Sequence, residues 1–140
     1  MKYEVLKLEN QLCFPLYAAS KEVVKRYRPY LDEIGLTYTQ YITMMVLWEH
    51  KTVNVKTLGS FLHLDSGTLT PLLKKLEAKG YLTRKRSDTD ERKLEIRITE
   101  GGEALNERAQ TIPTQLASCL NLSSEEVATL YGLLYKMLEG

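Results

Sequence analysis

The sequence predicts a mainly helical domain with one small β-hairpin. Apolar residues recur at helical spacing along most of the chain, several of these stretches follow a typical helix-capping residue, and the spacing changes to two only near residues 93–98. With 140 residues, 44% of them hydrophobic, the chain can bury a core without disulfides. We therefore expect one domain.

The first helix is expected to begin near Leu12 or Cys13 and to end at Pro29. A proline inside a helix removes one backbone hydrogen bond and clashes with the preceding turn. Pro15 should therefore lie in the first helical turn, where the N–H that it lacks would have no helical partner anyway.

Thr37 and Gln40 mark the start of the second helix. A threonine followed three residues later by glutamine is a capping-box pattern, in which both side chains satisfy backbone N–H groups. The apolar stretch that follows, residues 41–48, is the longest in the chain and is far too short to cross a bilayer. We therefore expect no membrane-spanning helix.

Two further helices follow in quick succession. Asn54 can cap a short helix over residues 55–62. The next helix should run from about residue 65 to residue 79, after which Gly80 favours a left-handed helix stop. Two helices joined by a short turn are typical of a helix-turn-helix.

A β-hairpin is expected after these helices. Leu94, Ile96 and Ile98 alternate with charged neighbours, as in a half-buried strand, and residues 82–86 are the expected partner strand. The polar segment between them, residues 87–92, should form an exposed tip. A helix-turn-helix followed by a hairpin describes a winged helix-turn-helix.

Helices also end the chain. Thr99 is expected to cap a helix that reaches Thr111 or beyond and that Pro113 disturbs. Ser123 and Glu126 form a second capping box before a last helix with one apolar face.

Basic residues are concentrated in the middle of the sequence. Residues 51–100 carry eleven Lys or Arg against seven Asp or Glu, although the whole chain has a formal net charge of only +1. Within residues 74–97 the balance is nine to five. A local excess of this size is typical of a surface that binds a polyanion, so we expect double-stranded DNA as a partner.

The second helix of the helix-turn-helix carries its leucines on one face. Leu69, Leu72, Leu73 and Leu76 should point into the core. The opposite face then presents hydroxyls, small side chains and cations, which suit a major groove because they can approach base edges and neutralise phosphate. The candidate DNA contacts on this helix are Ser66, Thr68, Thr70, Pro71, Lys74 and Lys75.

The hairpin adds further cations. Arg92 is at the expected tip, where a guanidinium can enter the narrower minor groove, and a neighbouring carboxylate should hold it in position. The candidate DNA contacts on the hairpin are Arg84, Arg86, Asp90, Arg92 and Lys93.

The chain contains the segment LDSGTLTPLLKKLEAKGYLTRKRSDTDERKLEIRIT, with a D-x-R tip at Asp90 to Arg92. In these features it resembles the MarR family of winged-helix transcriptional regulators. The resemblance implies a homodimer that binds an inverted-repeat operator. It further implies that residues 1–36 and 100–140 form the dimerisation region, and that residues 37–99 form the DNA-binding lobe.

The N-terminal segment LENQLCFPLYAASKE is similar to the peroxide-sensing branch of that family, the OhrR-type repressors. The resemblance implies a repressor that releases its operator when an organic peroxide oxidises Cys13. It also implies that Tyr27 and Tyr38 hydrogen-bond the Cys13 thiolate across the dimer, with Tyr17 as a further candidate. A first-turn cysteine fits this role, because the unpaired N–H groups of a helix start favour the thiolate, which peroxides oxidise.

Cys119 has two interpretations. In some relatives a second cysteine near the C-terminal helices forms a disulfide with the sensor of the other subunit, which makes Cys119 a candidate resolving cysteine. Its helical spacing with Leu116 and Leu120 predicts instead a buried, apolar residue. The sequence favours the alternative in which a low-molecular-weight thiol captures the oxidised Cys13.

Enzymatic and metal-dependent activities are not expected. No His/Asp pair, Gly-rich phosphate loop or C-x-x-C motif accompanies Cys13, as a thiol peroxidase would require. His50 and His63 are far apart in the sequence and have no cluster of further ligands, so neither a metal nor another cofactor is predicted. A regulator that binds a small aromatic effector instead of reacting with peroxide stays an open alternative, since nine residues are tyrosine.

The N-terminus also bears on location. It lacks the apolar core and the small-residue cleavage site of a secretory signal, and two cysteines are too few for a disulfide framework. We therefore expect the protein in the cytoplasm.

Overall fold

The computed structural model describes residues 1–89 and 93–140 of the chain. Helices make up most of it, and the strands of one small sheet lie between residues 52 and 98. The helices are α1 (Cys13–Asp32), α2 (Tyr38–His50), α3 (Val55–Leu62), α4 (Ser66–Ala78), α5 (Glu100–Ala104), α6 (Asn106–Ala109), α7 (Ile112–Ala117) and α8 (Ser124–Glu139). The short 3₁₀ turns and the strands are η1 (Glu4–Leu6), η2 (Leu8–Asn10), β1 (Thr52–Asn54), β2 (Leu82–Arg86) and β3 (Leu94–Ile98).

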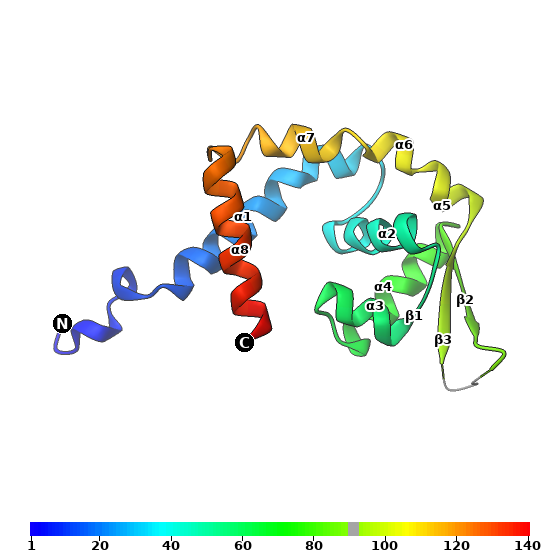
Figure 1. Cartoon of the computed structure of the whole chain (residues 1–140), viewed down its shortest axis with the longest axis horizontal. Coiled ribbons are helices and arrows are strands. Elements are labelled where there is room, and N and C mark those ends of the chain that lie inside the picture. The colour runs from blue at the N-terminus through cyan, green and yellow to red at the C-terminus, as the bar shows by residue number, and fades with distance from the viewer. Residues whose placement is uncertain (90–92) are drawn as a thin grey trace.

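The elements fall into a projecting arm and a folded body. Figure 1 shows the N-terminal arm, residues 1–12, extending away from the body on one side. The winged lobe, which we define as residues 37–99, lies on the other side, and α5 to α7 run along the top of the view. α1 packs against both α2 and α7, and so ties the lobe to the C-terminal helices.

α1 begins where the sequence predicts but ends later. Cys13 is its first residue and Pro15 lies in its first turn. The helix continues through Pro29 to Asp32, so the predicted end at Pro29 is wrong. Pro29 removes only one hydrogen bond, and Leu31, which is 2% exposed, anchors the last turn in the core.

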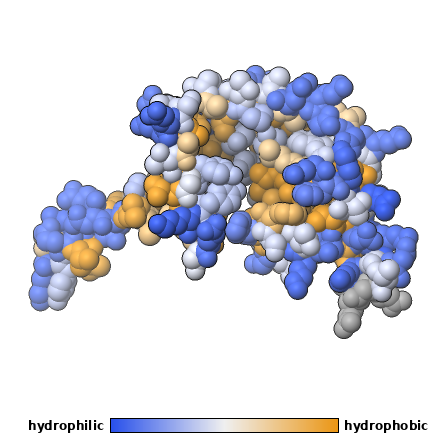
Figure 2. Space-filling model, viewed as in Figure 1, coloured by the Kyte–Doolittle hydropathy of each residue, from blue (hydrophilic) through white to orange (hydrophobic). Residues whose placement is uncertain are grey.

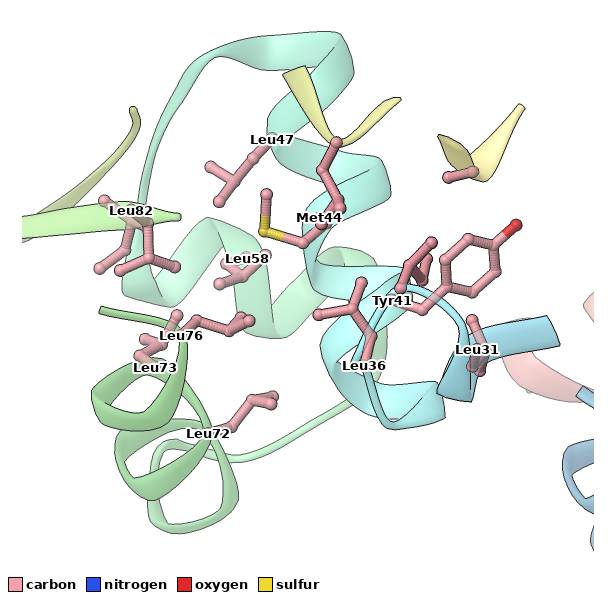
Figure 3. Packing of buried hydrophobic residues seen from close by; sticks show 14 of the residues in the cluster. Leu31, Leu36, Tyr41, Met44, Leu47, Leu58, Leu72, Leu73, Leu76 and Leu82 are labelled. Atoms are coloured by element: carbon pink, nitrogen blue, oxygen red, sulfur yellow. The ribbon is translucent and has the colours of Figure 1, made fainter. Parts of the chain in front are cut away.

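α2 is fixed at its start by the predicted capping box. The Gln40 backbone N–H donates to Thr37 Oγ1 at 3.3 Å, and the Thr37 N–H donates to Gln40 Oε1 at 3.0 Å. The helix then sends Met44 and Leu47 into the core. Figure 3 shows both side chains in the packed cluster that also contains Leu58 and Leu82.

The two helices of the helix-turn-helix start where the sequence predicts, and Asn54 is the predicted cap of the first. The Asn54 and Asp65 side chains each accept the backbone N–H of the third following residue, at 2.8 Å. His63 adopts a left-handed conformation at the end of α3, and Gly80 does so after α4, with φ of 54° and 83°. The Gly80 prediction is thereby confirmed.

The sheet has one strand more than predicted. β2 and β3 pair antiparallel as expected, but β1 pairs with the other edge of β3, which gives the order β1-β3-β2. The prediction of a two-stranded hairpin is therefore wrong in strand number. β1 is only three residues long, which is too short for an alternating pattern to be recognised. Its central residue, Val53, lies opposite the buried Ile96.

The predicted helix from Thr99 onward is divided into α5, α6 and α7. Thr99 Oγ1 caps α5 as expected, by accepting the N–H of Gly102 at 3.0 Å. The break at Leu105 is slight, because its backbone keeps helical angles of φ −65° and ψ −21°. Pro113 lies at the start of α7, where a proline is tolerated, so the single continuous helix is a wrong prediction.

α8 begins with the predicted Ser123–Glu126 capping box but buries none of its residues in this chain. The N-terminal arm is likewise exposed, and Figure 2 shows apolar residues along it. Large exposed apolar side chains occur on both elements. They include Val5, Leu6, Leu8 and Leu12 on the arm and Leu130, Leu133, Met137 and Leu138 on α8.

Candidate nucleic-acid interface and redox site

α4 has the two faces that the sequence predicts. Leu69, Leu72, Leu73 and Leu76 are buried in the core of the winged lobe. Figure 3 shows the last three on the inner side of α4. The opposite face is open to solvent, and the residues exposed on it are Ser66, Gly67, Thr68, Thr70, Pro71, Lys74, Lys75 and Ala78.

The hydroxyls near the start of α4 are held in place by local contacts. Thr70 Oγ1 donates to the Ser66 carbonyl at 2.8 Å, one turn earlier. Thr68 hydrogen-bonds Asp65 through its backbone N–H and its side chain, and these bonds lower the pKa of the Asp65 carboxyl below its usual range. The start of α4 therefore presents ordered hydroxyls rather than freely rotating ones.

Cations on the two described strands of the wing differ in their surroundings. Arg86, the last residue of β2, and Lys93, which directly precedes β3, are both exposed. Lys85 is exposed as well and pairs with Asp88 at 3.5 Å. Two predicted contacts of the wing, Asp90 and Arg92, lie outside the described residues.

Arg84 is directed toward α4. Its Nε and Nη2 donate to Glu77 Oε1 at 3.2 and 3.0 Å, and its side chain is 22% exposed. The predicted DNA contact is thus engaged in an ion pair within the lobe. Glu77 was not among the candidate residues, because nothing in a linear sequence indicates that it meets Arg84 across the turn at Gly80.

Cys13 is exposed at the start of α1. The residue before it, Leu12, has an apolar side chain that cannot cap the helix, so the N–H groups of the first turn keep their partial positive charge beside the sulfur. Tyr17 follows one turn later; it is exposed and lies under the Lys21 ammonium, 5.1 Å from its ring centre.

Tyr27 and Tyr38, which come from different helices, lie side by side in the chain. Their ring centres are 4.9 Å apart, and Tyr41 joins them at 5.7 Å from Tyr27. Burial and the neighbouring phenols raise the pKa of Tyr27 to about 12. Burial, together with Tyr135 of α8, also raises the pKa of Tyr38. Tyr41 and Tyr135 are members of this cluster that sequence patterns did not single out.

Cys13 and this tyrosine cluster are far apart within one chain. Tyr27 comes four turns after Cys13 on the same helix, and a helix rises by 1.5 Å per residue, which places the two backbones about 21 Å apart. Cys13 of one chain therefore cannot hydrogen-bond Tyr27 or Tyr38 of the same chain.

Cys119 is exposed, so the prediction of a buried residue is wrong. α7 ends at Ala117, and the helical spacing on which that prediction rested does not continue. The thiol lies 3.9 Å from the Tyr30 hydroxyl, and this contact raises the pKa of Tyr30. Arg26 donates to the Cys119 carbonyl, so two residues of α1 hold this segment.

Residues 1–89 and 93–140 contain no group of three or more His, Cys, Asp or Glu side chains that could hold a metal ion. Within the same ranges, no helix is both long enough and apolar enough to cross a membrane.

Comparison with known proteins defines the class. The family model described as transcriptional regulator SarA/Rot matches residues 21–108. The organic hydroperoxide resistance transcriptional regulator of Bacillus subtilis is 49% identical over 138 residues, which are 99% of this chain and 94% of that protein. An E. coli MarR variant solved with operator DNA is 28% identical, with a TM-score of 0.82, over 91% of this chain and 93% of that one.

AbfR of Staphylococcus epidermidis has been solved in several redox states. Reduced AbfR bound to DNA is 35% identical, with a TM-score of 0.81, over 99% of this chain and 97% of that one. Overoxidised AbfR bound to DNA is 34% identical, with a TM-score of 0.78, over 99% of this chain and 98% of that one. Disulfide-formed AbfR is 34% identical, with a TM-score of 0.69, over 99% of this chain and 95% of that one.

The chain belongs to the SarA/Rot family of transcriptional regulators and has the winged-helix fold of MarR-type proteins. Within that class it groups with the regulators of organic hydroperoxide resistance, which confirms the resemblance carried by the segment around Cys13. Since these relatives are regulators and not enzymes, the prediction of a non-enzymatic function is confirmed as well.

Proposed function

We propose that the chain is a homodimeric repressor of the cytoplasm that holds an inverted-repeat operator while Cys13 is reduced and releases it after an organic peroxide oxidises Cys13. One observation carries the proposal: Cys13 is exposed at the first turn of α1, whereas Tyr27 and Tyr38 form a half-buried pair four turns away. A second chain, with its α1 alongside, can bring a cysteine to these phenols.

The exposed apolar surface supports a dimer. α8 buries nothing in the isolated chain although it carries apolar side chains along its length, and the N-terminal arm has the same character. Burying such a surface is favourable by about 25 cal/mol per Å². We propose that residues 1–36 and 100–140 provide this interface, which leaves residues 37–99 to contact DNA.

In the proposed complex, α4 enters the major groove. Lys74 and Lys75 neutralise phosphates, the hydroxyls of Thr68 and Thr70 reach base edges, and Pro71 presents a small surface to them. The backbone N–H groups at Ser66 face a phosphate.

The wing adds contacts beside the groove. Arg86 and Lys93 bind the backbone on either side of the tip, and Arg92 is the proposed contact to the minor groove. The two wings of a dimer would flank half-sites about one helical turn apart.

The proposed reaction begins at the Cys13 thiolate. Its sulfur attacks one oxygen of the hydroperoxide, so that an S–O bond forms, the O–O bond breaks and the alkoxide leaves as the alcohol after it takes a proton. Cys13 is then a sulfenic acid. The hydrogen bonds from Tyr27 and Tyr38 of the partner subunit to the thiolate are lost in this step.

Cys119 is the proposed second reactant. Its exposure permits its thiolate to attack the Cys13 sulfur of the other subunit, which forms an S–S bond and expels hydroxide as water. AbfR was solved on DNA both when reduced and when overoxidised, and also in a disulfide form. This pattern supports a disulfide, rather than added oxygen alone, as the state of the present chain that releases DNA.

A Cys119→Ser variant tests this step. Reduced wild-type and variant proteins are bound to a fluorescent duplex that the wild-type protein selects from a random library, and are treated with cumene hydroperoxide. Wild type should form a covalent dimer on a non-reducing gel and release the duplex. The variant should form no such dimer and keep the duplex until a low-molecular-weight thiol is added, because a mixed disulfide then replaces the missing bond.

Two outcomes would contradict the disulfide step. Release from Cys119→Ser by peroxide alone would mean that oxygen added to Cys13 is sufficient. A wild-type protein that forms no covalent dimer, and that needs added thiol for release, would assign the resolving role to the small thiol. Mass spectrometry of Cys13 and Cys119 peptides identifies the species in each case.

A further inference from the structure

An ion pair connects α4, the proposed DNA-recognition helix, to the first strand of the wing, β2. Glu77 lies in the last turn of α4, and Arg84 lies in the middle of β2. Glu77 Oε1 accepts from Nε and Nη2 of Arg84 at 3.2 and 3.0 Å, and Oε2 accepts the Arg84 backbone N–H at 3.0 Å. Both carboxylate oxygens and two corners of the guanidinium are therefore used.

This contact spans a turn in which the chain reverses direction. α4 ends at Ala78, Gly80 takes a left-handed conformation, and β2 starts at Leu82. The angle between the recognition helix and the wing depends on this short connection. A carboxylate that binds both the backbone and the side chain of Arg84 fixes the first strand of the wing relative to the last turn of α4.

The position of Glu77 is unfavourable for DNA binding on charge alone. It is an acid within the most basic stretch of the chain, residues 74–97, and it follows shortly after Lys74 and Lys75. A carboxylate on a surface that faces phosphates repels them. Its hydrogen bonds to Arg84 hold the pKa of Glu77 below its usual range, so it stays ionised near neutral pH.

We propose that Glu77 and Arg84 are positioning residues that set the wing against α4, and that Arg84 does not itself bind phosphate. The inference rests on the proposed DNA-binding function. It replaces the direct DNA contact that the sequence predicts for Arg84. The guanidinium edge that would hydrogen-bond a phosphate donates to Glu77 instead.

Glu77→Gln tests the proposal, because charge repulsion and positioning of the wing predict opposite changes in DNA affinity. The substitution keeps the shape of the side chain and removes a negative charge. If charge alone mattered, DNA binding would tighten. Positioning predicts instead that affinity for the selected duplex falls about three- to tenfold, because the wing is no longer held. Glu95→Gln, an acid-to-amide change on β3, is the matched control and should not weaken binding.

The salt dependence of binding separates positioning from phosphate contact. Salt weakens binding, and the loss of one phosphate contact makes the slope of log K against log salt less steep by about 0.9. Arg84→Gln, which removes the cation, should weaken binding with an unchanged slope, because Arg84 contacts no phosphate. Lys74→Gln, at a proposed phosphate contact, should make the slope less steep. The double variant Glu77→Gln/Arg84→Gln should bind about as weakly as either single variant, because both act through one contact.

The outcomes distinguish this inference from the proposed function. A wild-type protein that selects no duplex contradicts DNA binding altogether. A wild-type protein that binds, with Glu77→Gln binding equally well or better, contradicts only the positioning role, as does a less steep salt dependence for Arg84→Gln. Thermal unfolding and native mass measurements establish that each variant is folded and dimeric. If Glu77→Gln does not fold, Arg84→Gln carries the test.

Discussion

At the residue scale, the chemistry of the sensor depends on where two kinds of side chain lie. Cys13 is exposed beside the uncapped N–H groups of a helix start, while Tyr27 and Tyr38 are half-buried and contact each other. The exposed sulfur of Cys13 is accessible to an oxidant. The phenols are desolvated, so they remain protonated and able to donate hydrogen bonds.

Tyr27 provides a pH-dependent prediction. Its pKa is about 12 in the folded chain, against 10.0 for an ordinary tyrosine, so between these values the unfolded state has lost a proton that the folded state keeps. The stability that this phenol contributes is fully present below pH 10 and is lost as the pH rises toward 12. Urea unfolding at stepped pH should show a steeper decline for wild type than for Tyr27→Phe. Parallel declines would contradict the prediction.

Single residues also show the limits of sequence patterns. The caps at Thr37, Asn54 and Ser123 were predictable because a cap and its N–H partner are three residues apart. Cys119 was not, because its exposure depends on where α7 stops and on contacts with α1, which is distant in the sequence.

At the element scale, the helix-turn-helix depends on close packing between Gly59 of α3 and the turn at Leu64. A Cβ added to Gly59 would lie 2.7 Å from the Leu64 carbonyl oxygen and 3.3 Å from Leu69. Helix α3 therefore needs a glycine where the chain turns into α4.

Gly59→Ala should destabilise the fold by about 1–3 kcal/mol, because the backbone must shift to relieve the overlap. Chemical denaturation measures this change, and DNA affinity should fall with it because α4 is displaced. Gly101→Ala is the control, since a Cβ there meets nothing closer than 3.4 Å. Equal stability of the two variants would show that the approach of α3 to the turn is not constrained at Gly59.

Elements differ in how far the sequence predicts them. The helices of the winged lobe start where the sequence predicts, since leucine spacing and capping residues are local features. Strand β1 was missed because its identity comes from pairing with β3, more than forty residues later. The end of α1 was misjudged because the burial of Leu31 outweighs the local effect of Pro29.

At the scale of the whole molecule, one chain supplies only part of each sensor site in the proposed homodimer. One chain carries an exposed cysteine, a separate tyrosine pair and a large uncovered apolar surface. A second copy would cover the surface and complete the sensor in one step. The tyrosine pair itself required the fold, because Tyr27 and Tyr38 come from different helices that meet only through α1–α2 packing.

The most direct test compares wild type with Cys13→Ser on the selected duplex, by fluorescence anisotropy, before and after one equivalent of organic hydroperoxide per subunit. Wild type should lose affinity at least about tenfold, which corresponds to about 1.4 kcal/mol of coupling between the sulfur and the DNA surface. Cys13→Ser should bind equally well before and after treatment. A wild-type protein that keeps its DNA, or a serine variant that releases it, would contradict the central claim.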